Sequence, residues 1–304
     1  MKHTSTSTAS VLAIAAMVVA LGCQHAARPV AAAPTKSGQL RIMTYNILNG
    51  GDTKTTGVVN RGEVLLRAIV QQKPDILALD ECANWHRDNA APLRKFETAL
   101  DMNAAMAITH GLSVSVLVRP NFPILQVLTD TKRQAHALTI VTVMAPDGKP
   151  IKILATHMNP FKPEERMKEA TEIVRYIGED ERCVVLGDLN SLSARDNFQV
   201  ADVPEEHRGR FIVDGAVHTG VIGALEKAGL VDSYRFKHPE PKANDRTVGT
   251  VISTDKAHAG TKLRLDYIFV TPNLTDAIQS VEVIQNDDTN HASDHFPVVL
   301  DLKL

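Results

Sequence analysis

The chain has 304 residues, of which 44% are hydrophobic and 22% are charged. This composition is ordinary for a globular protein and excludes a disordered or collagen-like one. The chain is long enough for one large domain or two small ones. The formal charge of −2, from 33 basic and 35 acidic side chains, leaves no overall electrostatic footprint for binding nucleic acid without sequence preference.

Residues 1–22 predict an export signal. Lys2 supplies a charged start, and the apolar stretch at 11–21 is too short to span a bilayer comfortably. The letters ALGC at 20–23 resemble a bacterial lipobox, so we expect Cys23 to be lipidated and to anchor the chain to a membrane of the cell envelope. A plain secretory signal is the alternative. Residues 23–38 are rich in Ala, Pro and Gly and predict a flexible tether.

Short apolar runs rich in Val, Ile and Leu recur from residue 40 to the C-terminus and predict β-strands. They read LRIMTYNIL, DILALDE, LSVSVLV, ALTIVTV, IKILATH, CVVLGDLN, RLDYIFV, VEVI and FPVVLDLKL. Helical patterns lie between them at 58–72, 92–101, 163–177 and 221–230. We therefore predict one α/β domain over residues 39–304, with long loops over a site at 196–219 and 236–262.

Polar side chains stand at the ends of several predicted strands. Taken singly, each is typical of a turn or of a structural hydrogen bond. Repeated on five strands, they predict one crevice in which a cation or ligand compensates the buried polar groups. The oxygen-rich set favours Mg²⁺ or Mn²⁺, and no Cys/His quartet for zinc is present. The residues are Asn46, Asp80, Glu81, His157, Asn159, Asp188, Asn190, Asp294 and His295, with Asp266 inside RLDYIFV.

The order of these motifs resembles the endonuclease/exonuclease/phosphatase superfamily, the DNase I-like hydrolases. The stretches TYNILNG, KPDILALDE, ATHMNP, GDLNS, GLVDSYR, RLDYIFV and SDHFPVVLDL carry the resemblance, which covers nearly all of residues 40–304. It implies a four-layer α/β/β/α sandwich, with two mixed β-sheets packed face to face and helices outside. It also implies hydrolysis of phosphate esters with a divalent metal.

Carried over position by position, the resemblance implies a role for each motif residue. Glu81 is then the main metal ligand, with Asn46 and Asp294 close to the metal. Asp188 and Asn190 orient or deprotonate the attacking water and steady the phosphoryl group. His295 then faces the scissile phosphate, with Asp266 as its carboxylate partner. His157 is a second histidine at the phosphate, and Asn159 near it is a substrate-binding residue.

Two places depart from the family pattern. Asp80 stands where glutamine commonly precedes the metal glutamate. It either adds a second acid beside Glu81 or, as strand alternation favours, points inward on the other face. The segment HGLSVSVLVRPNFPI matches only loosely; Arg119 is a candidate substrate-binding residue, with a surface salt bridge as the alternative. Cys82 and Cys183 lie beside apolar runs, which favours unpaired, buried thiols.

The sequence thus predicts an exported, monomeric, metal-dependent phosphoesterase that acts on diesters rather than monoesters. Nucleic acid, phospholipid head groups and small phosphorylated molecules are the competing substrates. A serine esterase is disfavoured because the chain has no GxSxG stretch. The alternative from another class is a non-catalytic surface module that keeps the fold for binding only.

Overall fold

The computed structural model describes residues 38–304 except 110, 180, 243, 253–260 and 262. The predicted signal peptide, Cys23 and residues 23–37 of the tether lie outside the described residues. No helix within the described part of the chain is long and apolar enough to cross a membrane.

Two six-stranded sheets form the centre of the domain. The first has the order β13-β14-β1-β2-β4-β3, and only its central pair β1 and β2 is parallel. Its strands are β1 (Gln39–Asn46), β2 (Ile76–Ala83), β3 (Asn103–Ala107), β4 (Leu112–Val118), β13 (Ile278–Val283) and β14 (Val298–Lys303).

The second sheet has the order β11-β12-β8-β7-β6-β5, and again only one central pair, β7 and β8, is parallel. Its strands are β5 (Ile124–Asp130), β6 (Ala137–Met144), β7 (Pro150–His157), β8 (Cys183–Asp188), β11 (Val231–Asp232) and β12 (Asp266–Val270). Both sheets are therefore mixed, as predicted. A separate two-stranded ribbon pairs β9 (Ile212–Val213) with β10 (Ala216–Val217).

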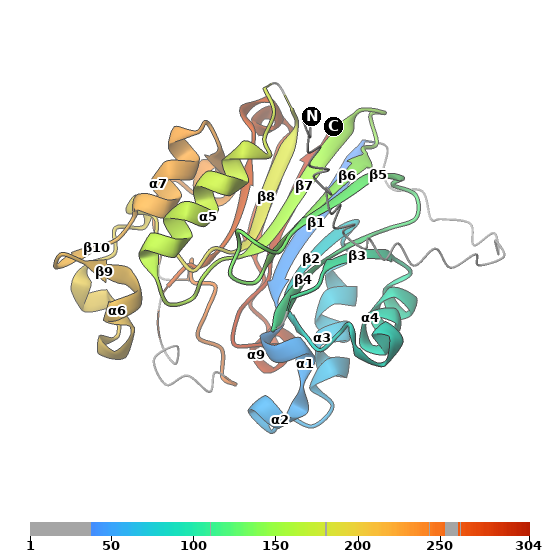
Figure 1. Cartoon of the computed structure of the whole chain (residues 1–304), viewed down its shortest axis with the longest axis horizontal. Helices are drawn as coiled ribbons and strands as arrows, with labels where there is room; N and C mark the ends of the chain where they lie inside the picture. Colours follow the sequence, from blue (N-terminus) through green and yellow to red (C-terminus); the bar gives the residue numbers. More distant parts are fainter. Residues whose placement is uncertain (1–37, 110, 180, 243, 253–260, 262) are drawn as a thin grey trace, which may run out of the picture. The chain divides into compact units, whose positions relative to one another are not determined.

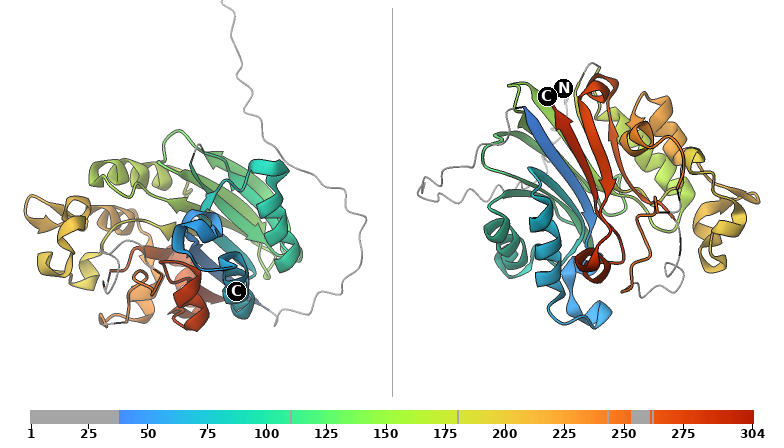
Figure 2. Two further views of the ribbon diagram at one scale, coloured as in Figure 1. Left: turned by 90° about the horizontal axis from the view of Figure 1, so that it is seen from below. Right: turned by 180° about the vertical axis from the view of Figure 1, so that it is seen from behind.

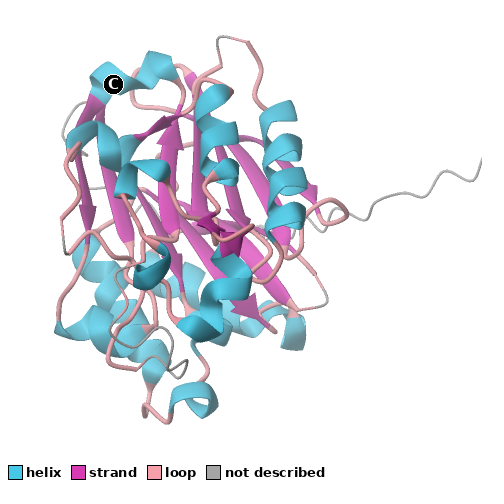
Figure 3. Ribbon diagram, turned by 90° about the vertical axis from the view of Figure 1, so that its left-hand side faces the viewer, coloured by secondary structure: helices cyan, strands magenta, loops and turns pink. Residues whose placement is uncertain are grey.

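The helices cover the outer faces of the two sheets (Figures 1 and 2). On the first sheet lie α3 (Arg61–Gln72), α4 (Arg87–Leu100) and α9 (Asp287–Ala292), and on the second lie α5 (Pro163–Arg175) and α7 (Gly220–Lys227). Figure 3 looks from the side of α5 and α7, which lie over the strands. The shorter helices are α1 (Leu48–Gly51), α2 (Thr53–Thr56), α6 (Arg208–Phe211) and α8 (Ser233–Lys237), with 3₁₀ turns at Ala194–Asp196, Val200–Asp202, Glu205–His207 and Pro272–Ala277.

Three apolar clusters fill the layers. The largest joins alternate residues of both sheets, among them Ile76, Val116 and Leu186, and lies between them. The second packs the first sheet against α3 and α4, and the third packs the second sheet against α5 and α7. Each central strand thus buries both of its faces, which is why these strands read as continuous apolar runs. The predicted four-layer α/β/β/α sandwich is confirmed.

The nine predicted strand runs all fall on strands, and the four predicted helices overlap α3, α4, α5 and α7. Strands β3 and β5 were not predicted. β3 reads NAAMA, which lacks β-branched residues, and β5 is an edge strand whose residues are mostly exposed or half-buried. Cys82 and Cys183 are both free and buried, as predicted.

Candidate active site

The carboxyl ends of the two parallel strand pairs deliver the central polar residues. The side chain of Asn46, the last residue of β1, links the two sheets: its Nδ2 donates to Oε1 of Glu81 on β2 (3.1 Å) and to Oδ2 of Asp188 on β8 (3.1 Å). Oε2 of Glu81 accepts from the backbone N–H of Asn49 at 2.9 Å. Two carboxylates from different sheets therefore converge on one amide.

A β-bulge turns Glu81 into this site. The register between β2 and β4 shifts between Leu79 and Cys82, and Glu81 has φ 60°, a value that non-glycine residues rarely adopt. In a regular strand, the side chain of Glu81 would point to the same face as that of Leu79, toward the helices. A strained backbone of this kind is concentrated at functional positions, where surrounding contacts hold it.

Asp80 points inward, as alternation predicted. Its side chain is fully buried between the sheets, and its Oδ2 accepts from the backbone N–H of Asp188 at 2.9 Å. Burial raises the pKa of Asp80 well above its usual range, and the neighbouring carboxylates of Asp188 and Asp266 add to that effect. Asp80 is therefore a structural link beneath Asp188.

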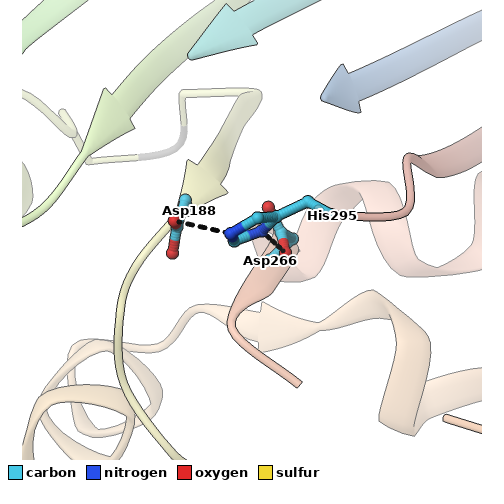
Figure 4. A group of neighbouring side chains, drawn as sticks. All are labelled: Asp188, Asp266 and His295. Atoms are coloured by element: carbon cyan, nitrogen blue, oxygen red, sulfur yellow. Dashed lines mark hydrogen bonds and ion pairs between the residues drawn. The ribbon is translucent and has the colours of Figure 1, made fainter. Parts of the chain in front are cut away.

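His295 and Asp266 form a hydrogen-bonded pair (Figure 4). Nδ1 of His295 lies 2.8 Å from Oδ2 of Asp266, and its Nε2 lies 3.7 Å from Oδ2 of Asp188. Burial alone would lower the pKa of His295, but the carboxylates of Asp266 and Asp188 outweigh it and raise that pKa well above the ordinary value. This shift favours the charged ring, in which Nδ1 donates to Asp266.

His157 and Asn190 complete the surroundings of Asp188. Nε2 of His157 lies 3.5 Å from Oδ2 of Asp188, and burial together with a neighbouring histidine, His136, lowers the pKa of His157 to about 3. The backbone N–H of Asn190 donates to Oδ1 of Asp188 at 2.9 Å, while its Nδ2 donates to the Met158 carbonyl at 3.1 Å. Asp188 thus lies between one charged and one neutral imidazole.

Asp294 approaches the same centre through Ser293. The hydroxyl of Ser293 contacts the Asn46 carbonyl at 2.6 Å and Oδ1 of Asp294 at 3.3 Å. The loop before β14 is held from the other side, because Gly249 donates its N–H to the Asp294 carbonyl at 3.0 Å. The predicted metal ligands Asn46, Glu81 and Asp294 are therefore gathered around the end of β1.

The donor set fits a divalent cation. The side chains of Asn46, Glu81 and Asp294 offer oxygen ligands, as Mg²⁺ and Mn²⁺ prefer. Asp188, Asp266 and His295 each offer one ligand atom, and these atoms lie within 4.8 Å of one another. The family resemblance assigns no metal to these three residues, and the 2.8 Å hydrogen bond between Asp266 and His295 favours a pair that holds a proton.

The two predicted substrate-binding residues, Arg119 and Asn159, are not linked to the residues around Asp188 in the way that Asn46, Glu81 and His295 are. Arg119 follows β4, which runs antiparallel to β2, so it lies beside Asp75 at the start of β2, the opposite end of the sheet from Glu81. Its Nε donates to the Pro74 carbonyl at 2.9 Å and lies 3.9 Å from Oδ1 of Asp75, so the structure places Arg119 away from the other site residues, in the salt bridge given as the alternative. Asn159 lies close to His157 in sequence, but its Oδ1 accepts from the N–H groups of Phe161 and Lys162 in a turn.

Sequence reasoning missed His136 and Thr247. The ring of His136 lies 4.1 Å, centroid to centroid, from that of His157. The Thr247 hydroxyl accepts from the N–H groups of Leu265 (2.9 Å) and Asp266 (3.0 Å), which fixes the start of β12. Only strand pairing could have revealed His136, because it precedes Ala137, whose partner on β7 is His157.

Comparison with known families agrees with this geometry. The sequence model described as the Endonuclease/Exonuclease/phosphatase family matches residues 43–295. The chain belongs to this family. Members of the endonuclease/exonuclease/phosphatase family are phosphoesterases that use divalent metals. No curated protein sequence matches the chain significantly.

Solved structures of the family share the fold. A 3′ phosphatase from Neisseria, bound to a product DNA hairpin, has a TM-score of 0.64 and 18% identity over 87% of this chain and 100% of its own. A mannosyl-6-phosphatase from Bacteroides thetaiotaomicron has a TM-score of 0.61 and 16% identity over 86% and 98%. A family protein from the same bacterium also has a TM-score of 0.61 and 16% identity, over 87% and 94%.

Proposed function

We propose that this chain is a Mg²⁺- or Mn²⁺-dependent hydrolase of phosphate esters that prefers diesters. The observation that supports it is the position of Asp188: its Oδ2 lies 3.5 and 3.7 Å from the Nε2 atoms of His157 and His295 and accepts from Asn46. A carboxylate between two imidazoles has the donors and the acceptor that attack on a phosphoryl group requires.

Each side chain has a part in that reaction. Asp188 takes a proton from the attacking water, and burial, which raises its pKa, makes it a stronger base than an exposed aspartate. His295, charged and held by Asp266, donates from Nε2 to a phosphoryl oxygen. His157 remains neutral and offers a second hydrogen bond. A cation held by Glu81, Asn46 and Asp294 would stabilise the charge that builds on the phosphoryl and leaving oxygens.

The preference for diesters follows from charge. Among the described residues, the side chains assigned to the site include four carboxylates, those of Glu81, Asp188, Asp266 and Asp294, and one imidazolium but no lysine or arginine. A phosphodiester has one negative charge, whereas a monoester near neutral pH has up to two. The single charge costs less to place beside these carboxylates. Nucleic acid and phospholipid head groups supply diesters, whereas inositol phosphates are monoesters.

The test is a hydrolysis assay with bis(p-nitrophenyl) phosphate and p-nitrophenyl phosphate, in Mg²⁺, in Mn²⁺ and in EDTA. We expect metal-dependent release of nitrophenol, faster from the diester. Asp188→Asn should reduce kcat at least about a hundredfold, and Asp276→Asn, an exposed aspartate after β12, should not. A folded wild-type protein without metal-dependent turnover would support the binding-module alternative instead.

We further propose that the protein is exported and anchored at the cell envelope through Cys23, and that it acts as a monomer. The proposed export and anchoring rest on the N-terminal sequence. A panel of single- and double-stranded DNA, RNA, sphingomyelin and inositol phosphates, assayed with and without EDTA, would identify the natural substrate class.

A further inference from the structure

We propose that His136 is a positioning residue that holds the ring of His157 against Asp188. The inference rests on the proposed function, because it concerns the same site. His136 belongs to the turn between β5 and β6 and is followed by Ala137, which pairs with His157 across the β6–β7 ladder. The backbone therefore sets the two histidines side by side at the end of adjacent strands.

The rings of the two histidines are in direct contact. Their centroids lie 4.1 Å apart at an interplanar angle of 41°. Nδ1 of His157 is buried without a hydrogen-bond partner among the described residues. A histidine that faces a reacting group usually has its second nitrogen oriented by a carboxylate or carbonyl. For His157, the neighbouring ring of His136 fixes the orientation of the imidazole instead.

A buried carboxylate on α5 fixes both histidine-bearing segments. Oε1 of Glu169 accepts from the N–H of Ala135 at 2.6 Å, and its Oε2 accepts from the N–H of Asn159 at 2.8 Å. Ala135 directly precedes His136, and Asn159 lies two residues after His157. The side chain of Gln134, also buried, joins Thr156 to the Glu169 carbonyl. Movement of one histidine segment relative to the other is therefore opposed on both sides.

The imidazole of His295 is held in a different way from that of His157. His295 is oriented by Asp266 through a direct hydrogen bond, so it needs no ring beside it. The site thus holds its two histidines by two different means, a carboxylate for the charged ring and a packed imidazole for the neutral ring. The packed ring leaves His157 uncharged, whereas a carboxylate behind it would favour the imidazolium.

The test is a double-mutant cycle on steady-state hydrolysis of the nitrophenyl ester that the wild type turns over, at saturating metal. His136→Ala should lower kcat about tenfold with KM within about twofold, because His157 loses its fixed orientation. His136→Phe, which keeps a ring against His157, should recover most of that loss. In a His157→Ala background, His136→Ala should have no further effect. His291→Ala, an exposed histidine on α9, is the control.

Unchanged kcat in His136→Ala, or the same tenfold loss in the His157→Ala background, would overturn the proposal, since the second result means that His136 acts by itself. Thermal unfolding checks that each variant is folded. A second measurement does not need turnover: His136→Ala should shift the ring signals of His157 in NMR spectra, identified by their absence in His157→Ala. Unshifted signals would refute the contact. A wild type without activity would instead refute the proposed function.

Discussion

Gly187 shows how closely the strands approach beneath the site. A Cβ atom at this position would lie 1.9 Å from the Thr156 carbonyl oxygen on β7 and 3.2 Å from Oδ2 of Asp80, and Gly187 has φ 135°. Only glycine fits both the space and the backbone conformation. The glycine of GDLNS therefore lets Asp188 reach its position, although it does no chemistry.

We predict that Gly187→Ala lowers the free energy of unfolding by about 3 kcal/mol or more, because the backbones of β7 and β8 must separate. Urea unfolding measures this. Gly223→Ala is the matched control: Gly223 lies within α7, and a methyl group added there would meet no heavy atom within 4 Å, so alanine should be neutral or stabilising by up to about 1 kcal/mol. Equal midpoints for Gly187→Ala and wild type would contradict the packing described.

A substitution of Glu81 tests the proposed metal ligands. Glu81→Ala removes the carboxylate that the β-bulge turns toward Asn46, so the Kd for Mn²⁺ should rise about tenfold or more, by comparison with losses of metal-site residues elsewhere. Isothermal titration calorimetry with Mn²⁺ alone measures it. Glu240→Ala, an exposed glutamate, should bind as the wild type does. If both variants bind alike, the cation lies elsewhere, and the Asp188–Asp266–His295 trio becomes the candidate.

At the scale of elements, α5 does more than cover the second sheet. Its sequence begins with Pro163 and two glutamates, which favour a helix start, and its inner face packs Ala170 and Ile173 on the sheet. The same inner face carries Glu169, whose burial raises its pKa to about 7 in spite of two backbone N–H donors and the charge of Arg166 on the next turn. Glu165 on the same helix raises it further.

The pH dependence follows from that shift. The folded pKa of Glu169 is raised above the value of 4.5 for an unperturbed glutamate, so the folded state holds the proton more tightly than the unfolded chain. Its stabilising contribution is full below about pH 4.5 and is lost as the pH rises through about 7, a change of roughly 3 kcal/mol.

Glu169→Gln abolishes this titration. The free energy of unfolding of Glu169→Gln, relative to wild type, should therefore rise between pH 5 and pH 8 by up to about 3 kcal/mol, on top of a constant offset for the changed hydrogen bond. Urea unfolding at pH 5, 6.5 and 8 measures the difference. Glu164→Gln, on the exposed face of the same helix, controls for the lost charge. A difference that stays constant with pH would contradict the assignment.

At the scale of the whole chain, β1 connects the first described residues to the site. The described chain enters the strand at Gln39 and reaches the site at Asn46, about 23 Å farther along at 3.3 Å per residue (Figure 1).

We predict that Cys23→Ser moves the protein from the membrane fraction to the soluble fraction, because the lipidated thiol is lost. Fractionation of cells followed by immunoblotting measures it. Ala26→Ser, three residues later in the tether, is the control and should remain in the membrane fraction. Membrane retention of the Cys23→Ser protein would show that another segment anchors it.

The linear pattern of residues was enough to predict one α/β domain, and the family resemblance carried by its motifs supplied the four layers. Apolar runs mark strands because buried strands exclude water on both faces, and alternation placed Asp80 inward. Polar residues at strand ends indicated a shared crevice because parallel neighbours finish on one edge. The family resemblance carried by the motif order then implied Glu81, Asp188 and His295 as site residues.

Only the tertiary structure decided the rest, since it depends on which strands pair and in what register. The antiparallel direction of β4 places Arg119 at the far end of the sheet, and a bulge that no local pattern reveals turns Glu81 toward Asn46. His136 meets His157 only because β6 and β7 are neighbours. Side-chain identity is local, whereas pairing is a property of the whole chain.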